Sequence, residues 1–108
     1  MSFTVVDARQ LAAAPLDAAA QFGRDRLAMA RAATDDVIVL FATADHTHAS
    51  WRKAMIEELA REAAPRRVNG VVAGSGANGQ TGANEVMDYL ARAPGVTGQV
   101  LEVAGSNA

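Results

Sequence analysis

The run VIVLF at residues 37–41 decides the fold class, because it places five apolar side chains in a row. Three of the five are β-branched, two aspartates precede the run, and Thr43 follows it closely. An apolar run of this length that does not alternate with polar residues is typical of a strand buried on both faces of a parallel sheet. The run therefore indicates an α/β protein.

Further strands and helices are expected to alternate on both sides of this central strand. The other β-prone segments are residues 3–6, 68–73 and 96–103, and the helical segments are residues 16–33, 49–64 and a short stretch capped by Asn84. Short connections in such an alternation predict a sheet whose crossovers are helices. We therefore predict a single domain, residues 1–108, with about four mainly parallel strands and three crossover helices.

Composition excludes several classes of protein. The 108 residues contain no cysteine, which excludes disulfides and thiolate metal sites and fits a cytoplasmic location. No apolar run reaches the eighteen or so residues of a membrane span, and MSFTVVDARQ lacks the features of a signal peptide. Ten Lys and Arg residues are scattered among twelve Asp and Glu residues, so we expect no nucleic-acid partner.

Two segments of the second half resemble short-chain dehydrogenases. In residues 57–74, EELAREAAPRRVNGVVAG, a helix ending in Ala-Pro leads into a Val-Asn strand, as in that family. Residues 96–105, VTGQVLEVAG, are similar to the closing strand of the family, and VIVLFAT is similar to the strand before its catalytic serine. The resemblance implies a Rossmann-like half-domain that corresponds to the C-terminal half of the family.

The resemblance also implies that the family's catalytic groups are missing. Counted back from Pro65, the Tyr-x-x-x-Lys pair falls on Asp45 and Ala49, and only Thr43 lies near the serine position. The glycine-rich cofactor turn of the family would lie upstream of the matching part. We therefore expect no catalytic residues, no enzymatic activity and no cofactor, with NAD(P) as the open alternative. A reduced oxidoreductase would need a cofactor half from another chain.

The segment Asp45-His46-Thr47-His48 follows the central strand and contains both histidines of the chain. Ligands of open α/β sheets bind beside the carboxyl ends of strands. One carboxylate and two imidazoles have the chemistry of a divalent-metal or acid–base site. The alternative is a polar loop that caps the next helix. We favour the cap and predict no metal site.

A glycine-rich segment follows the third strand. Residues 74–79, GSGANG, spell the dinucleotide fingerprint GxGxxG, with Glu102 further on. Against that reading, we expect residues 74–82 to be an irregular loop, whereas the fingerprint needs its third glycine inside a helix. The segment still supports a second functional hypothesis, a small ligand- or nucleotide-binding protein with a strand-end crevice. Its residues would be Thr43, Asp45, His46, His48, Asn69, Gly74 and Ser75.

Apolar helix faces support the first functional hypothesis, a non-catalytic interaction or accessory module. The predicted contact residues are Leu16, Ala20, Gly23 and Leu27 on one helix and Trp51, Met55 and Leu59 on the next. Arg52 and Lys53 are placed on the opposite, solvent-exposed face. Right-handed crossovers in one direction put their helices on one side of a sheet. In the resembled family, moreover, the corresponding helices form a dimer interface. We therefore expect a homodimer or a complex with a related, full-length dehydrogenase-like chain.

Overall fold

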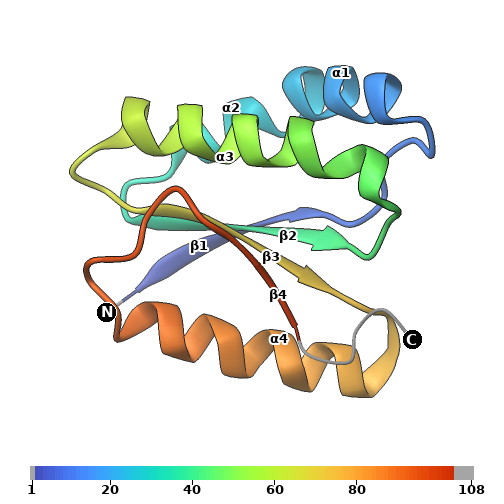
Figure 1. The fold of residues 1–108 in the computed structure, drawn as a ribbon. Helices are drawn as coiled ribbons and strands as arrows, with labels where there is room; N and C mark the ends of the chain where they lie inside the picture. Colours follow the sequence, from blue (N-terminus) through green and yellow to red (C-terminus); the bar gives the residue numbers. More distant parts are fainter. Residues whose placement is uncertain (1, 104–108) are drawn as a thin grey trace.

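The fold is a four-stranded parallel sheet between two helical layers (Figure 1). The computed structural model describes residues 2–103. The strands are adjacent in chain order, and all neighbouring pairs are parallel. Their bounds are β1 (Phe3–Ala8), β2 (Asp36–Ala42), β3 (Val68–Ala73) and β4 (Val100–Glu102). The predicted α/β, Rossmann-like arrangement is confirmed.

The helices lie on both faces of the sheet. On one face are α1 (Pro15–Asp25), α2 (Leu27–Ala32) and α3 (Ala49–Ala63), the last preceded by a short 3-10 helix, η1 (His46–His48). The other face is covered by α4 (Gly76–Ala91) (Figure 1). No helix within residues 2–103 is both long and apolar enough to cross a membrane.

The central run contributes to both faces, as its unbroken apolarity predicts. Val37, Val39 and Phe41 join the core under α1–α3, while Ile38 and Leu40 join the core over α4. Alternate side chains of a strand point to opposite faces of its sheet, so a strand covered on both sides needs apolar residues at every position.

The predicted helix over residues 16–33 is two helices. Arg26 separates α1 from α2, with φ −116° and ψ −26°, and its Nε donates to the Asp7 carbonyl oxygen at 2.8 Å. The apolar spacing does not reveal the break, because Phe22 and Ala30, on either side of it, lie in the same core.

The prediction of an irregular loop at residues 74–82 is wrong, because α4 begins at Gly76. The glycines there serve close packing. A Cβ at Gly79 would lie 1.9 Å from the Gly74 carbonyl oxygen, and one at Gly82 would lie 2.3 Å from Cγ1 of Val103. Gly76 itself has φ +85°, a conformation that suits glycine. The glycine content predicted an irregular loop, whereas the tertiary structure requires residues without a Cβ at Gly79 and Gly82.

The crossovers do not share one hand, contrary to expectation. The chain advances across the sheet in one direction, so helices on opposite faces give crossovers of opposite hand. The two that pass through α1–α2 and α3 are right-handed, and β3–α4–β4 is left-handed (Figure 1). Left-handed crossovers make up only about 2% of cases. As a result, α4 covers the face that right-handed crossovers alone would leave open.

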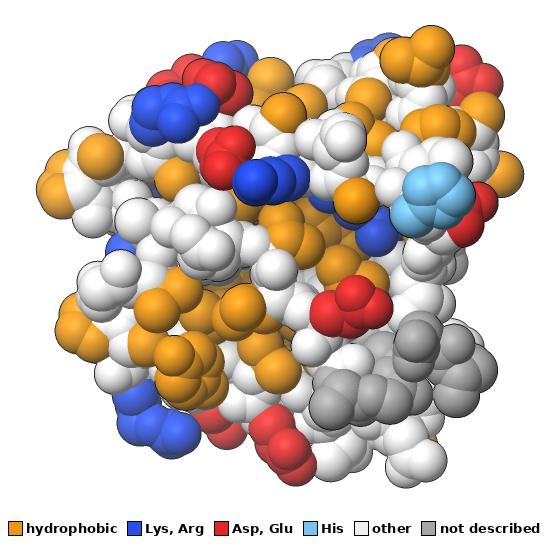
Figure 2. Space-filling view, in the orientation of Figure 1, with side chains coloured by type: hydrophobic (Ala, Val, Ile, Leu, Met, Phe, Trp, Pro, Cys, Tyr) orange, Lys and Arg blue, Asp and Glu red, His pale blue; other side chains and the backbone are white. Residues whose placement is uncertain are grey.

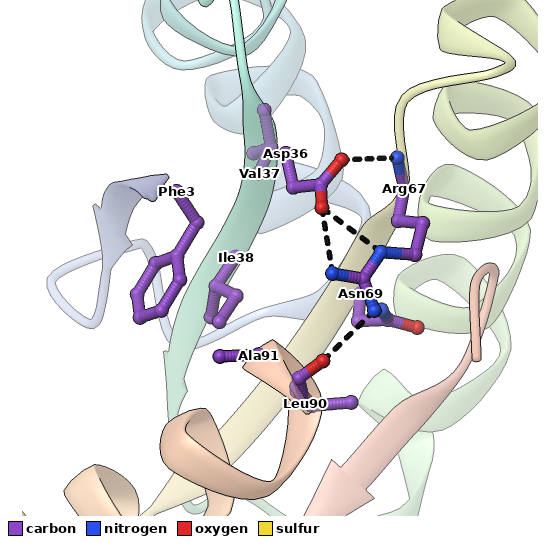
Figure 3. A pocket seen from close by; sticks show the side chains of 8 residues that line it. All are labelled: Phe3, Asp36, Val37, Ile38, Arg67, Asn69, Leu90 and Ala91. Atoms are coloured by element: carbon purple, nitrogen blue, oxygen red, sulfur yellow. Dashed lines mark hydrogen bonds and ion pairs between the residues drawn. The ribbon is translucent and has the colours of Figure 1, made fainter. Parts of the chain in front are cut away.

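Arg67 joins the sheet to α4 at the edge where the strands begin (Figure 3). Its Nε and backbone N–H donate to the two carboxylate oxygens of Asp36 at 2.9 and 2.8 Å. Its Nη1 donates to the carbonyl oxygens of Leu90 and Ala93 at 2.8 and 2.6 Å. The adjoining cavity has a volume of only about 10 Å³, so this edge is filled by its own side chains.

Candidate functional site

Two adjoining clefts lie near the carboxyl ends of the strands, one beside the end of β2 and along β4, the other at the ends of β1 and β2. The larger, about 490 Å³, opens between α3 and β4, and the smaller, about 290 Å³, opens between α3 and the segment that joins β1 to α1. Figure 2 shows a hollow on this side of the molecule, with apolar side chains inside it and charged side chains around it. The residues that line both clefts are Ala44, Asp45, His48 and Arg52.

Arg52 is the least expected of these shared residues. It is only 9% exposed, and its guanidinium carbon lies 4.7 Å from the centre of the Phe41 ring and 5.9 Å from that of Trp51. Its Nε is buried without a hydrogen-bond partner among the described residues. Within residues 2–103, no ion pair joins Arg52 to Glu102, the acidic residue across the larger cleft.

The prediction that Arg52 faces solvent is wrong. The buried side of α3 consists of Arg52, Ile56, Leu59 and Ala60, while Trp51 and Met55 flank it. The available signal was the spacing 52, 56, 59 and 60, which follows one helical face as well as the stripe through Trp51 does. The stripe begins with the charged residue Arg52, and this charge argued against assigning it to the buried face of the helix.

Two effects make Arg52 unfavourable for the stability of the fold. Removing a charge from water without a partner costs several kcal/mol, and stacking on aromatic rings recovers only about 0.5–2 kcal/mol. A cation in the first turn of a helix also opposes the helix dipole. Burial lowers the pKa of Arg52, and the Glu102 carboxylate partly opposes this shift. Residues that break such rules cluster at functional sites.

His48 supports the wall between the clefts and has no free ring nitrogen. Trp51 Nε1, which only donates, lies 3.0 Å from His48 Nδ1, so Nδ1 must accept. The proton is therefore on Nε2, which donates to the Ala13 carbonyl oxygen at 2.9 Å. The neutral ring is held on both sides. His48 consequently has no lone pair for a metal, and residues 2–103 contain no cluster of three His, Cys, Asp or Glu residues suited to one.

Asp45 caps η1 at the mouth of both clefts. Its Oδ1 accepts from the Thr47 backbone N–H at 2.9 Å and also from the Thr47 hydroxyl. These hydrogen bonds lower the pKa of Asp45 against a small opposing effect of desolvation. His46, by contrast, is exposed at the rim of the larger cleft. This geometry is the capping arrangement predicted from the sequence as the alternative to a metal site.

The remaining predicted ligand residues are not brought together. Thr43 lines the smaller cleft, whereas Gly74 and Ser75 form the β3–α4 turn outside both clefts. The placement of Asn69 in the crevice is wrong. It lies near the opposite edge of the sheet, buried, where its amide donates to the Val96 carbonyl oxygen at 3.0 Å and accepts from the Gln99 N–H at 3.1 Å.

Most predicted interface residues face inward. Leu59 belongs to the buried core, Trp51, Met55 and Leu27 pack against it, and Gly23 is half-buried. Leu16 is 86% exposed, and Ala20 is also exposed. The stripe through Trp51, Met55 and Leu59 therefore packs mainly against the core of this domain. Phe22, Phe41 and Trp51 form one aromatic cluster, with ring centres 5.7–6.2 Å apart.

Charged groups of both signs surround the larger cleft. The cations are Arg52 and Lys53, and the carboxylates are Asp45, Glu57 and Glu102. Its apolar lining includes Val72 and Val100. A buried guanidinium beside such a mixed rim is suited to hold a small polar molecule in one orientation.

Comparison with protein families agrees with this fold. The family model described as "SDR-like: Short chain dehydrogenase-like protein" matches residues 6–103. The chain belongs to the short-chain dehydrogenase-like family. No curated protein and no solved structure matches this short-chain dehydrogenase-like domain.

Membership of this family raises the question of whether the domain binds a dinucleotide. The glycine turn at residues 74–79 matches the dinucleotide fingerprint in its local structure but not in its position in the fold. Gly74, Gly76 and Gly79 do form a strand–turn–helix unit, with Gly79 inside α4. The fingerprint, however, belongs to right-handed βαβ units, whereas β3–α4–β4 is left-handed (Figure 1). Because the β3–α4–β4 crossover is left-handed, Glu102 lies on the other side of the glycine turn from the position of the acidic residue in the fingerprint. The β3–α4–β4 unit therefore does not fit the dinucleotide fingerprint.

Proposed function

We propose that this short-chain dehydrogenase-like domain binds a small molecule in the two clefts at the carboxyl edge of its sheet, and that it carries out no hydride transfer on its own. One observation carries the proposal. Arg52 is buried between the clefts, and its Nε has no hydrogen-bond partner among the described residues. Buried polar groups are normally hydrogen-bonded, and exceptions call for a specific reason. The rest of the Arg52 side chain lines both clefts, where a ligand can supply an acceptor to the guanidinium.

The arrangement of tyrosine and lysine supports the absence of hydride transfer. Asp45 and Ala49 occupy the positions that match the family's Tyr-x-x-x-Lys pair. Tyr89, the single tyrosine, lies on α4, across the sheet from α3, and lines neither cleft. Proton transfer to a substrate oxygen needs an acid within hydrogen-bond reach. The clefts therefore offer binding groups without the family's acid.

Backbone-amide NMR of the purified chain tests the proposal. The probes are amino acids, carboxylates, inorganic phosphate, AMP, NAD and NADPH, each titrated separately. We expect at least one class to shift the signals of residues 44–53 and 98–102 in a saturable way, and to raise the melting temperature by mass action. No saturable shift in these segments with any probe would contradict binding. Oxidation of NADPH with small aldehydes or ketones would contradict the absence of hydride transfer.

A second proposal, association with another chain, is favoured by one observation on α1. Leu16 is 86% exposed, and Ala20 lies one turn further along the same exposed face. A large exposed apolar side chain beside small residues permits close helix–helix contact. We propose that this face supports a homodimer or a complex with a related chain. Analytical ultracentrifugation tests it: we expect a dimer that Leu16→Glu dissociates, and a monomer at high micromolar concentration would contradict the homodimer.

A further inference from the structure

The chemistry of Arg52 defines one half of the ligand. A guanidinium presents its N–H donors as a planar fork that matches a carboxylate or a phosphate. Arg52 is 9% exposed, lines both clefts and holds an Nε without a partner in the part of the chain that the structure describes. An anionic group bound in the cleft would pair with the guanidinium N–H groups that line it and neutralise the charge of Arg52.

The acidic rim argues for a carboxylate rather than a phosphate. Asp45, Glu57 and Glu102 face two cations, Arg52 and Lys53, around the larger cleft. Each additional negative charge on a ligand would therefore meet repulsion from the rim. A dianionic phosphate is disfavoured, whereas a ligand whose carboxylate is balanced by a cationic group avoids this repulsion.

Glu102 defines the other half of the ligand. It is the last residue of β4, lies exposed on the lining of the larger cleft and belongs to no ion pair within residues 2–103. Its charge nevertheless acts on Arg52 across the cleft. A ligand bound between Arg52 and Glu102 can pair with both side chains if it carries a negative group at one end and a positive group at the other.

We propose that the larger cleft binds a small zwitterion of the amino-acid type, with its carboxylate on Arg52 and its ammonium group on Glu102. This inference rests on the proposed small-molecule binding and names the class of ligand. The volume of about 490 Å³ leaves room for a side chain beside the two charged groups. Val72 and Val100 give that part of the lining an aliphatic character.

A matched series of probes tests the assignment. L-leucine carries both charges, 4-methylpentanoate only the carboxylate, L-leucinamide only the ammonium group, and inorganic phosphate represents the rejected anion. The Kd of each is measured by backbone-amide NMR on the full chain. We expect L-leucine to bind most tightly and L-leucinamide at least about tenfold more weakly, because a hydrogen bond between charged groups is lost.

Two substitutions assign the two ends of the zwitterion. Arg52→Met should weaken L-leucine about tenfold or more and abolish the preference for L-leucine over L-leucinamide. Glu102→Gln should weaken L-leucine about threefold and bring it level with 4-methylpentanoate, since an exposed charge contributes less. Arg61→Met and Glu85→Gln, exposed positions outside both clefts, are the matched controls and should leave the Kd unchanged.

The possible outcomes separate this inference from the proposed function. If phosphate or 4-methylpentanoate binds the cleft more tightly than L-leucine, the zwitterion is wrong and small-molecule binding stands. If none of the four probes shifts residues 44–53 or 98–102, the zwitterion is wrong, and the wider panel decides the binding function. Should Arg52→Met fail to fold, Arg52→Gln removes the charge while it keeps a polar side chain at this position. An unchanged preference for L-leucine in that variant would overturn the role of Arg52.

Discussion

Two arginines, one at each edge of the sheet, show how differently this domain uses the same side chain. At the edge where the strands begin, Arg67 binds both oxygens of Asp36 and the carbonyl oxygens of Leu90 and Ala93 (Figure 3). At the edge where the strands end, Arg52 is buried against Phe41 with an Nε that has no partner among the described residues. Arg67 therefore holds elements together, whereas the Arg52 Nε makes no such bond within residues 2–103.

The contrast extends to the space around each side chain. The cavity beside Arg67 measures about 10 Å³, while the two clefts beside Arg52 measure about 490 and 290 Å³. Removal of one partner from a buried ion pair strongly destabilises the fold, because the other charge stays buried without compensation. A buried cation without a partner lowers stability even while it is present. The comparison thus predicts opposite consequences for equivalent substitutions.

The largest effect is expected at the edge where the strands begin. Arg67→Met removes the guanidinium from the Asp36 carboxylate, whose side chain is only 21% exposed, and leaves it the backbone N–H of residue 67. We expect the free energy of unfolding to fall by about 3–5 kcal/mol, measured by urea denaturation. Arg92→Met, at an exposed position, is the control. A loss no larger than that of the control would show that Arg67 does not hold this edge together.

A smaller loss of stability is expected from a substitution in the tightly packed β3–α4 turn, at the edge where the strands end. Gly79→Ala forces a methyl group toward the Gly74 carbonyl oxygen and should destabilise the domain by about 1–3 kcal/mol. Gly23→Ala in α1 meets nothing within 4 Å and should instead stabilise the domain by about 0.4–1 kcal/mol. Thermal and urea unfolding measure both. Equal effects of the two substitutions would mean that the β3–α4 turn has as much room for a Cβ as α1 has at Gly23.

Arg52→Met should raise the stability of the domain even though it removes binding. An apolar side chain of similar length replaces a buried cation that has lost its water, and we expect a gain of about 1 kcal/mol in the free energy of unfolding. Urea denaturation without ligand measures it. A loss as large as that of Arg67→Met would make Arg52 structural and end the contrast between the two edges.

The smallest effect concerns pH and the cap at the mouth of the clefts. Hydrogen bonds from Thr47 lower the pKa of Asp45 in the folded state, so this carboxylate stabilises the fold above its unfolded pKa of about 4. That contribution is lost as the pH falls through the lowered, folded pKa. Asp45→Ala should therefore be less stable than the natural chain at neutral pH and match it in acid.

Thr47→Val provides the companion measurement for this cap. It removes the hydroxyl that binds Asp45, and the pKa of Asp45 should rise toward its ordinary value. Carboxyl NMR of Asp45 as a function of pH measures the shift. An unchanged pKa would show that the Thr47 hydroxyl contributes nothing to the cap.

The clefts were only partly predictable, for reasons that differ between residues. Asp45 and Thr43 were found because they follow a recognisable strand, and strand ends meet at one edge of a parallel sheet. Asn69 was misplaced because it begins its strand instead of ending it. Arg52 was missed because its charge argues for solvent, and the aromatic cluster that covers it comes from β2 and α3 together.

Local sequence determined the strands and their parallel order. The run VIVLF needs cover on both faces, and alternating helices allow a parallel connection. Only the tertiary structure decided the left-handed passage through α4, the helical state of the glycine segment and the inward position of Arg52. Each of these depends on contacts between segments far apart in the chain. Propensity and periodicity describe a residue's neighbours along the chain and do not include the side chains that the fold brings against it.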